Sequence, residues 1–121
     1  MQSASQAYQN VARQTSSPRD LEASLLLKAA QRLQTVHDTW DEQHSGLDEA
    51  LLFNRKLWSV FLTEATNAAN PMPKEVRQNV ANLGIFVMNQ TVTAMSDPRP
   101  EQLGSLIKIN RDLAAGLLGR S

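Results

Sequence analysis

Cysteine is absent from the sequence, so disulfide bonds and thiol chemistry are excluded for this chain. Aromatic residues make up only 5% of it, and no window approaches the roughly 18 consecutive apolar residues of a membrane-spanning helix. The first dozen residues are polar, with no apolar run behind a basic cluster, so we expect neither a signal peptide nor membrane attachment. These absences predict a cytoplasmic protein.

An excess of charge of either sign is also missing. Twelve basic and twelve acidic residues give a formal net charge of zero. Proteins that bind polyanions usually carry a basic patch or a basic excess, because phosphate neutralisation supplies much of their affinity. The composition therefore argues against nucleic-acid binding.

Features that would support catalysis are sparse. The five glycines are scattered, and Gly84 stands alone, so no glycine-rich loop is present to cradle a phosphate. No serine, threonine or aspartate stands in a nucleophile elbow. We therefore expect a protein that is not an enzyme, with no catalytic residue, no cofactor and no small-molecule substrate.

Apolar residues recur at helical spacing along most of the chain. The pattern predicts helices over residues 17–46, 47–67 and 73–95 and from residue 100 onward, and no alternating β-branched run supports a strand. Residues 1–16 form a polar N-terminal segment whose spacing suffices for a short or frayed helix. We predict an all-α, single-domain helical bundle over residues 17–121, with four main helices plus that N-terminal segment.

Prolines give the clearest helix boundaries. Ser17 can cap a helix whose first position is Pro18. Pro71 and Pro73 force a turn, because neither can donate to a helix ladder. The helix over 73–95 then carries an apolar stripe, and we expect it to be the central core helix; the stripe is Val76, Val80, Leu83 and Val87.

The best candidate metal ligands are His37, Asp41 and His44, at spacing i, i+4, i+7. On a continuous helix all three would share one face. No fourth ligand or supporting residue is evident nearby, and Asp38 and Glu42 indicate a solvated acidic helix end. We predict no metal site here.

Two further patterns could support nucleic-acid binding, and each also has a more ordinary interpretation. The turn near Pro71 could gather four cations into a small patch, although such cations usually belong to solvated faces; they are Arg55, Lys56, Lys74 and Arg77. Trp40 and Trp58 could stack on bases, but both lie on leucine-containing stripes, which favours burial in the core.

Asparagines on or beside the apolar stripes are the least ordinary feature, because helix propensity disfavours them and burial requires a partner. They are Asn54, Asn79, Asn82 and Asn110. One interpretation is hydrogen bonding between helices that fixes their register. The other is a polar groove floor that binds the backbone of an incoming peptide, and both interpretations can hold together.

Four groups of motifs, in order, resemble the FlaF family of bacterial flagellin-synthesis regulators. They are LEA at 21–23 with LLKAA at 26–30, LDEALLFNRKLW at 47–58, the prolines with EVRQN at 75–79, Leu83 and Phe86, and LI, INR and AAGL between 106 and 117. The chain departs from the family pattern at Met72, between the prolines. It also departs at the uncharged Asn89 and Gln90, where a basic residue is expected, which weakens any nucleic-acid role.

The resemblance implies a small non-enzymatic protein required for flagellin production, opposing the translational repressor FlbT. It is expected to bind flagellin before export, as a cytoplasmic chaperone or adaptor. The alternative is post-transcriptional action on flagellin messenger RNA, directly or through FlbT. For the partner-binding surface we select the proline turn, the exposed side of the following helix and the end of the last helix: Pro71, Met72, Arg77, Asn79, Phe86, Leu113, Leu117 and Leu118.

A third hypothesis is a structural homodimer. The last predicted helix carries Leu103, Leu113 and Leu117 around the polar Asn110. A polar residue inside an apolar seam can specify the pairing of two helices. On this hypothesis that helix would pair with the same helix of a second copy.

Overall fold

The computed structural model describes residues 17–119, and this range is all-helical. Its helices are α2 (Pro18–Asp38), α3 (Leu47–Ala65), α4 (Lys74–Ser96) and α5 (Pro100–Leu117). The described range contains no strand. The prediction of an all-α bundle with four main helices is confirmed. The predicted N-terminal helical segment lies outside the described residues.

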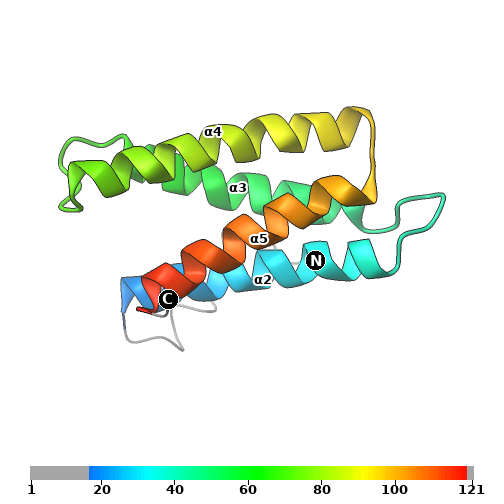
Figure 1. Cartoon of the computed structure of the whole chain (residues 1–121), viewed down its shortest axis with the longest axis horizontal. Coiled ribbons are helices and arrows are strands. Elements are labelled where there is room, and N and C mark those ends of the chain that lie inside the picture. Colours follow the sequence, from blue (N-terminus) through cyan, green and yellow to red (C-terminus); the bar gives the residue numbers. More distant parts are fainter. Residues whose placement is uncertain (1–16, 120–121) are drawn as a thin grey trace.

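The bundle consists of two helix pairs laid side by side. α5 packs along α2, α4 packs along α3, and α2 contacts α3. The contact between α4 and α5 is the smallest of these. α4 and α5 meet near their short connection and run apart toward the end at which α4 begins (Figure 1). One end of the bundle is therefore more open than the other.

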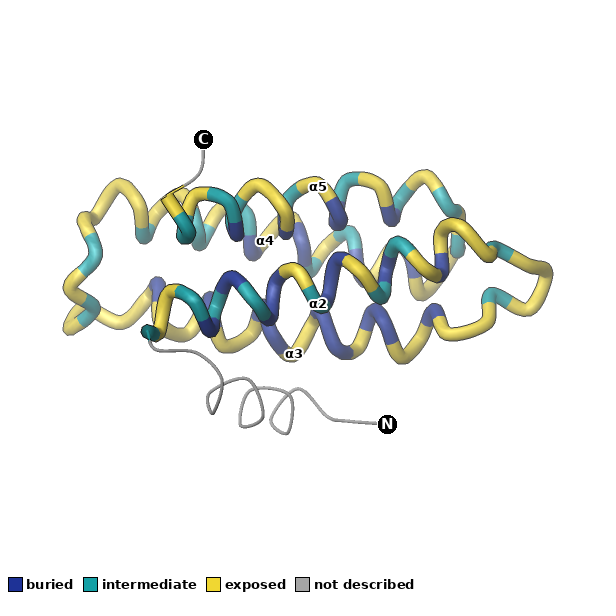
Figure 2. Tube along the Cα trace, turned by 90° about the horizontal axis from the view of Figure 1, so that it is seen from below, coloured by how far each residue is buried: buried dark blue, intermediate teal, exposed yellow. Residues whose placement is uncertain are grey.

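The core lies between α2, α3 and α5. Buried positions of each helix turn inward, as the burial colouring in Figure 2 shows. Trp58 is fully buried and meets Phe61 edge to face, with ring centroids 5.5 Å apart. Leucines of α2 belong to the same core cluster, and they recur at helical spacing along an almost continuous stripe; they are Leu21, Leu25, Leu26 and Leu33.

A buried hydrogen-bond network, which we call the asparagine network, joins three helices. The Trp58 indole Nε1 donates to Asn110 Oδ1 at 2.9 Å, and Asn110 Nδ2 donates to Asn54 Oδ1 at 2.7 Å. Asn110 Nδ2 also reaches the Leu26 carbonyl oxygen at 3.4 Å, which ties α5 to α2 as well as α3. The interpretation of these two asparagines as bonds between helices is confirmed, since such pairing satisfies buried amides.

The burial of the asparagine network bears on the dimer hypothesis, which stays a prediction. Leu103 and Asn110 are both fully buried within the chain, so the central part of that stripe faces the core and not a second copy. Asn79 and Asn82 lie on the exposed side of α4 instead, where Asn82 Oδ1 accepts from Gln78 Nε2 at 3.0 Å. The four asparagines therefore divide into a buried pair and an exposed pair.

The first described helix is shorter than predicted, and the expectation of a helix reaching Gly46 is wrong. α2 ends at Asp38, and the chain turns through residues 39–46. The Asp41 carboxylate accepts from the Ser45 backbone N–H at 3.1 Å and from the Ser45 hydroxyl at 2.9 Å. Such local bonds compete with helix formation. The same bonds hold the pKa of Asp41 below its ordinary value.

The prediction that the helix over 73–95 is the central core helix is also wrong. α4 contacts α3 and, to a smaller extent, α5, and it buries only Gly84, Val87, Thr91 and Ala94. Val76 of the predicted stripe is 43% exposed. At Gly84 a Cβ atom would lie 2.5 Å from Leu62 Cδ2, so this glycine permits the close approach of α4 to α3. α4 is therefore a peripheral helix.

Candidate functional site

A groove of about 980 Å³ opens at the end of the bundle where α2 begins and α5 ends. In Figure 1 this is the end that carries the connection between α3 and α4. We call it the end groove. It is lined mainly by apolar side chains, asparagines and three charged residues: Pro18, Arg19, Glu22, Glu64, Asn67, Ala69, Asn70, Pro71, Met72, Pro73, Val76, Leu113, Gly116 and Leu117.

One wall of the end groove is the turn between α3 and α4, and side-chain hydrogen bonds hold it in shape. Asn67 Oδ1 accepts from the Ala69 backbone N–H at 2.9 Å. Asn70 Oδ1 accepts from the Met72 backbone N–H at 2.9 Å, and Asn70 Nδ2 donates to the Glu64 carbonyl oxygen at 2.9 Å. Asparagine favours such turns because its side chain reaches its own backbone two residues on. These bonds hold the turn in the shape that forms the wall.

The opposite wall comes from the last turns of α5. Leu113 and Leu117 are spaced i, i+4, so they lie on one face of the helix. Both are half-buried, and both also pack against the core. Their side chains thus present apolar surface to the groove from a rigid helix.

Four of the eight predicted binding residues line the end groove together. Pro71 and Met72 come from the turn, and Leu113 and Leu117 come from α5, more than 40 residues later. The sequence prediction treated these as two regions. The fold brings them into one site.

Two other predicted residues have structural roles beside the end groove. Arg77 Nη1 donates to the Asn67 carbonyl oxygen at 3.2 Å, which ties the first turn of α4 to the proline turn. Leu118 caps α5 through its backbone N–H, which donates to the Ala114 carbonyl oxygen at 3.0 Å, and its side chain packs against the core. Neither side chain lines the groove.

The last two predicted residues extend the site along α4. Val76, Asn79, Leu83 and Phe86 are spaced by three, four and three residues, so they form one stripe on the helix. Val76 lines the groove, and Phe86 at the other end is 44% exposed. We call these four residues the α4 stripe. It continues the apolar surface of the end groove away from the turn.

The charged residues of the end groove are Arg19, Glu22 and Glu64, and none of them was predicted. Partial burial raises the pKa of Glu22, the negative charge of Glu64 raises it further, and Arg19 opposes both effects. Sequence offers little signal for this arrangement. Glu22 stands in a leucine-rich helix start, and Glu64 reaches it only through the tertiary fold.

We expect Glu22→Gln to stabilise the free protein at neutral pH, raising the melting temperature by about 1–3 °C. A raised pKa in the folded state means that the ionised carboxylate costs free energy there. That cost is present above the folded-state pKa and disappears below the ordinary value of 4.5. Thermal unfolding followed by circular dichroism at neutral pH and near pH 4 checks this, with the exposed Glu75→Gln as control. A gain of equal size at both pH values would contradict it.

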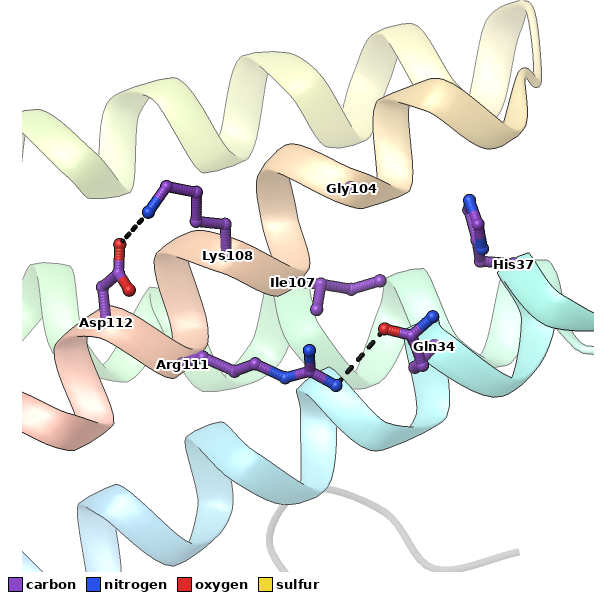
Figure 3. A pocket seen from close by; sticks show the side chains of 7 residues that line it. All are labelled: Gln34, His37, Gly104, Ile107, Lys108, Arg111 and Asp112. Carbon is purple, nitrogen blue, oxygen red and sulfur yellow. Dashed lines mark hydrogen bonds and ion pairs between the residues drawn. The ribbon is translucent and has the colours of Figure 1, made fainter.

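A second, smaller hollow of about 320 Å³ lies between α2 and α5. Arg111 Nη2 donates to Gln34 Oε1 at 3.2 Å, and Lys108 Nζ lies 2.7 Å from Asp112 Oδ2 (Figure 3). Both cations are exposed and already have partners within the protein. We therefore place the candidate site at the end groove.

The candidate metal and basic sites are not assembled. His37 is on α2, whereas Asp41 and His44 lie in the turn after it, and no described residues form a group of three or more metal-ligating side chains. Leu62 of α3 lies against Gly84 of α4. Arg55 precedes Leu62 on α3 and Lys74 precedes Gly84 on α4, and these two helices run in opposite directions (Figure 1). At the helical rise per residue, the two cations are therefore about 25 Å apart along the bundle. The hypothesis that the turn gathers the four cations into one patch is wrong.

The burial of the two tryptophans and the hydropathy of the described helices also bear on function. Trp58 is fully buried, and Trp40 is half-buried and packs against the core, as expected from their leucine-containing stripes. Of the described helices, none combines the length and hydropathy needed to cross a membrane.

Comparison with known proteins gives one family. A family model described as "Flagellar protein FlaF" matches residues 4–117. Curated proteins and solved structures gave no significant match. The matched range includes every residue that lines the end groove and the whole α4 stripe.

Proposed function

Because this chain belongs to the FlaF family of flagellar proteins, we propose that it binds flagellin in the end groove and along the α4 stripe. In this role it is a non-enzymatic cytoplasmic chaperone or adaptor that promotes flagellin synthesis and secretion. The observation that carries the proposal is the end groove, a mainly apolar site whose walls are a hydrogen-bonded turn and the last turns of α5.

The size and lining of the groove suit a helical segment of a protein partner. Amphipathic helices dock through apolar anchors spaced i, i+3, i+4 and i+7 into grooves of this kind. A volume of about 980 Å³ has room for several such anchors. The α4 stripe then offers a continuation along which a docked helix can extend, since α4 and α5 run apart toward the groove (Figure 1).

The apolar exposure of α4 supports the same proposal. From Asn79 to Ser96 the helix contains no charged residue, and Phe86 of the α4 stripe is 44% exposed. A large apolar side chain exposed beside an apolar groove is typical of protein interaction sites. Affinity for such a partner comes from buried anchors more than from charge.

Co-expression with flagellin tests the proposal. We expect tagged protein purified from a flagellin-expressing cell to carry flagellin in a stoichiometric complex that survives size-exclusion chromatography. The same purification from a flagellin-deleted strain, mixed afterwards with an unrelated secreted protein, is the control. Recovery of the tagged protein alone, at flagellin concentrations of tens of micromolar, would contradict the proposal.

The geometry gives less support to direct RNA binding. The four cations behind that hypothesis are spread along α3 and α4, so no single basic face is formed by them. Binding through phosphates would weaken steeply as salt is added. Action through FlbT stays a prediction, and it is compatible with a flagellin-binding groove.

A further inference from the structure

The three charged residues of the end groove carry an inference about which partner segment it accepts. Glu22 comes from α2 and Glu64 from the last turn of α3, so two carboxylates from different helices line one apolar groove. Arg19 is the one cation among the lining residues. The charge of the lining is therefore −1, from two acids and one base.

No described residue forms a close ion pair with either carboxylate. Within the described part of the chain, the ion pairs are His37–Asp38, Arg99–Asp97 and Lys108–Asp112, and none involves the groove residues. Arg19 is three residues before Glu22 on the same helix face, but partial burial and the charge of Glu64 outweigh its effect on the pKa of Glu22. The free groove thus holds a carboxylate whose negative charge is costly.

Hydrogen bonds fix the main chain of Glu64 at the edge of the groove. Its carbonyl oxygen accepts from the Asn67 backbone N–H at 3.2 Å and from Asn70 Nδ2 at 2.9 Å. The end of α3 is therefore fixed to the turn that forms one wall of the groove.

We propose that the end groove selects a flagellin segment that presents a lysine or arginine beside its apolar anchors, and that Glu22 and Glu64 receive this cation. The inference rests on the proposed function. An ammonium or guanidinium group at this place would form charge-assisted hydrogen bonds and relieve the repulsion between the two acids. A segment with an acidic residue at the same place would be rejected.

Charge-neutralising variants test the inference with flagellin itself as the probe. We expect Glu22→Gln and Glu64→Gln each to weaken flagellin binding several-fold, and the double variant to weaken it by about 10-fold at low salt. The difference from the unaltered protein should shrink as salt is raised toward 1 M, because salt screens the lost attraction. Isothermal titration calorimetry at several salt concentrations measures this.

Two controls separate a selective role from a structural one. Glu75→Gln removes an exposed carboxylate of α4 that does not line the groove, and it should leave the affinity unchanged. Glu22→Gln should bind more weakly while unfolding at a higher temperature. A residue that only supports the fold would lose stability and affinity together.

The outcomes are distinct for the two proposals. If flagellin binds the double variant as tightly as the unaltered protein, with the same salt dependence, the charge selection is wrong and flagellin binding stands. If the unaltered protein does not bind flagellin, the proposed function fails, and the inference fails with it.

Discussion

Replacing Asn110 with leucine should lower the free energy of unfolding by about 3–5 kcal/mol, because it removes the centre of the asparagine network. Leucine has the same number of side-chain heavy atoms and branches at the same carbon, so no cavity is created. The Trp58 indole N–H and Asn54 Oδ1 would both lose their partners in a fully buried environment. Asn54 Nδ2 already has no hydrogen-bond partner among the described residues, so both polar atoms of the Asn54 amide would then lack one. Urea unfolding monitored by Trp fluorescence measures the loss.

The same substitution on the surface is the matched control. Asn82→Leu breaks only an exposed bond to Gln78, and we expect a change within about 0.5 kcal/mol. The combination of Asn54→Leu, Asn110→Leu and Trp58→Phe should lose less than the sum of its single variants, because it removes both partners of the Trp58–Asn110 and Asn110–Asn54 bonds. An Asn110→Leu protein as stable as Asn82→Leu would show that the network does not contribute.

Introducing two carboxylates into the apolar part of the end groove should weaken flagellin binding by about 100-fold or more. The variant is Met72→Glu combined with Leu117→Glu, which places a charge on each wall. Docking would then bury two unpaired charges next to the existing Glu22 and Glu64. Titration calorimetry or surface plasmon resonance with purified flagellin measures the loss.

Ile85→Glu is the control for this experiment. Ile85 is 57% exposed on α4 and lies nine residues after Val76, about half a turn round the helix from the groove. We expect the Ile85→Glu variant to bind flagellin with unchanged affinity. The groove variant should retain helical circular dichroism, since Met72 lies in a turn and Leu117 is in the last turn of α5. Equal loss in both variants would point to a different binding surface.

Boundaries marked by proline were predictable because the chemistry of proline is local. Pro73 immediately precedes α4, and Pro100 begins α5, close to the predicted positions. The end of α2 was missed for a reason that is equally local but less visible. The apolar spacing continues to Trp40, whereas the Asp41 carboxylate accepts two hydrogen bonds from Ser45 in the turn before Gly46.

The role of α4 could not be predicted from periodicity, because an apolar stripe has the same spacing whether it faces the core or a partner. The stripe that begins at Val76 has the spacing expected of a core-facing stripe, yet Val76 is exposed and lines the end groove. The walls of that groove were identified as two separate regions. Their meeting depends on how α5 packs along α2, which no local pattern reports.

Order of synthesis gives the asparagine network a further consequence. Leu26 and Asn110 are 84 residues apart, so the bond between them must wait until α5 has left the ribosome. The same helix supplies the Leu113 wall of the end groove. A nascent chain therefore acquires its locked core and its groove at the same stage, and the proposed binding site does not exist until α5 has been synthesised.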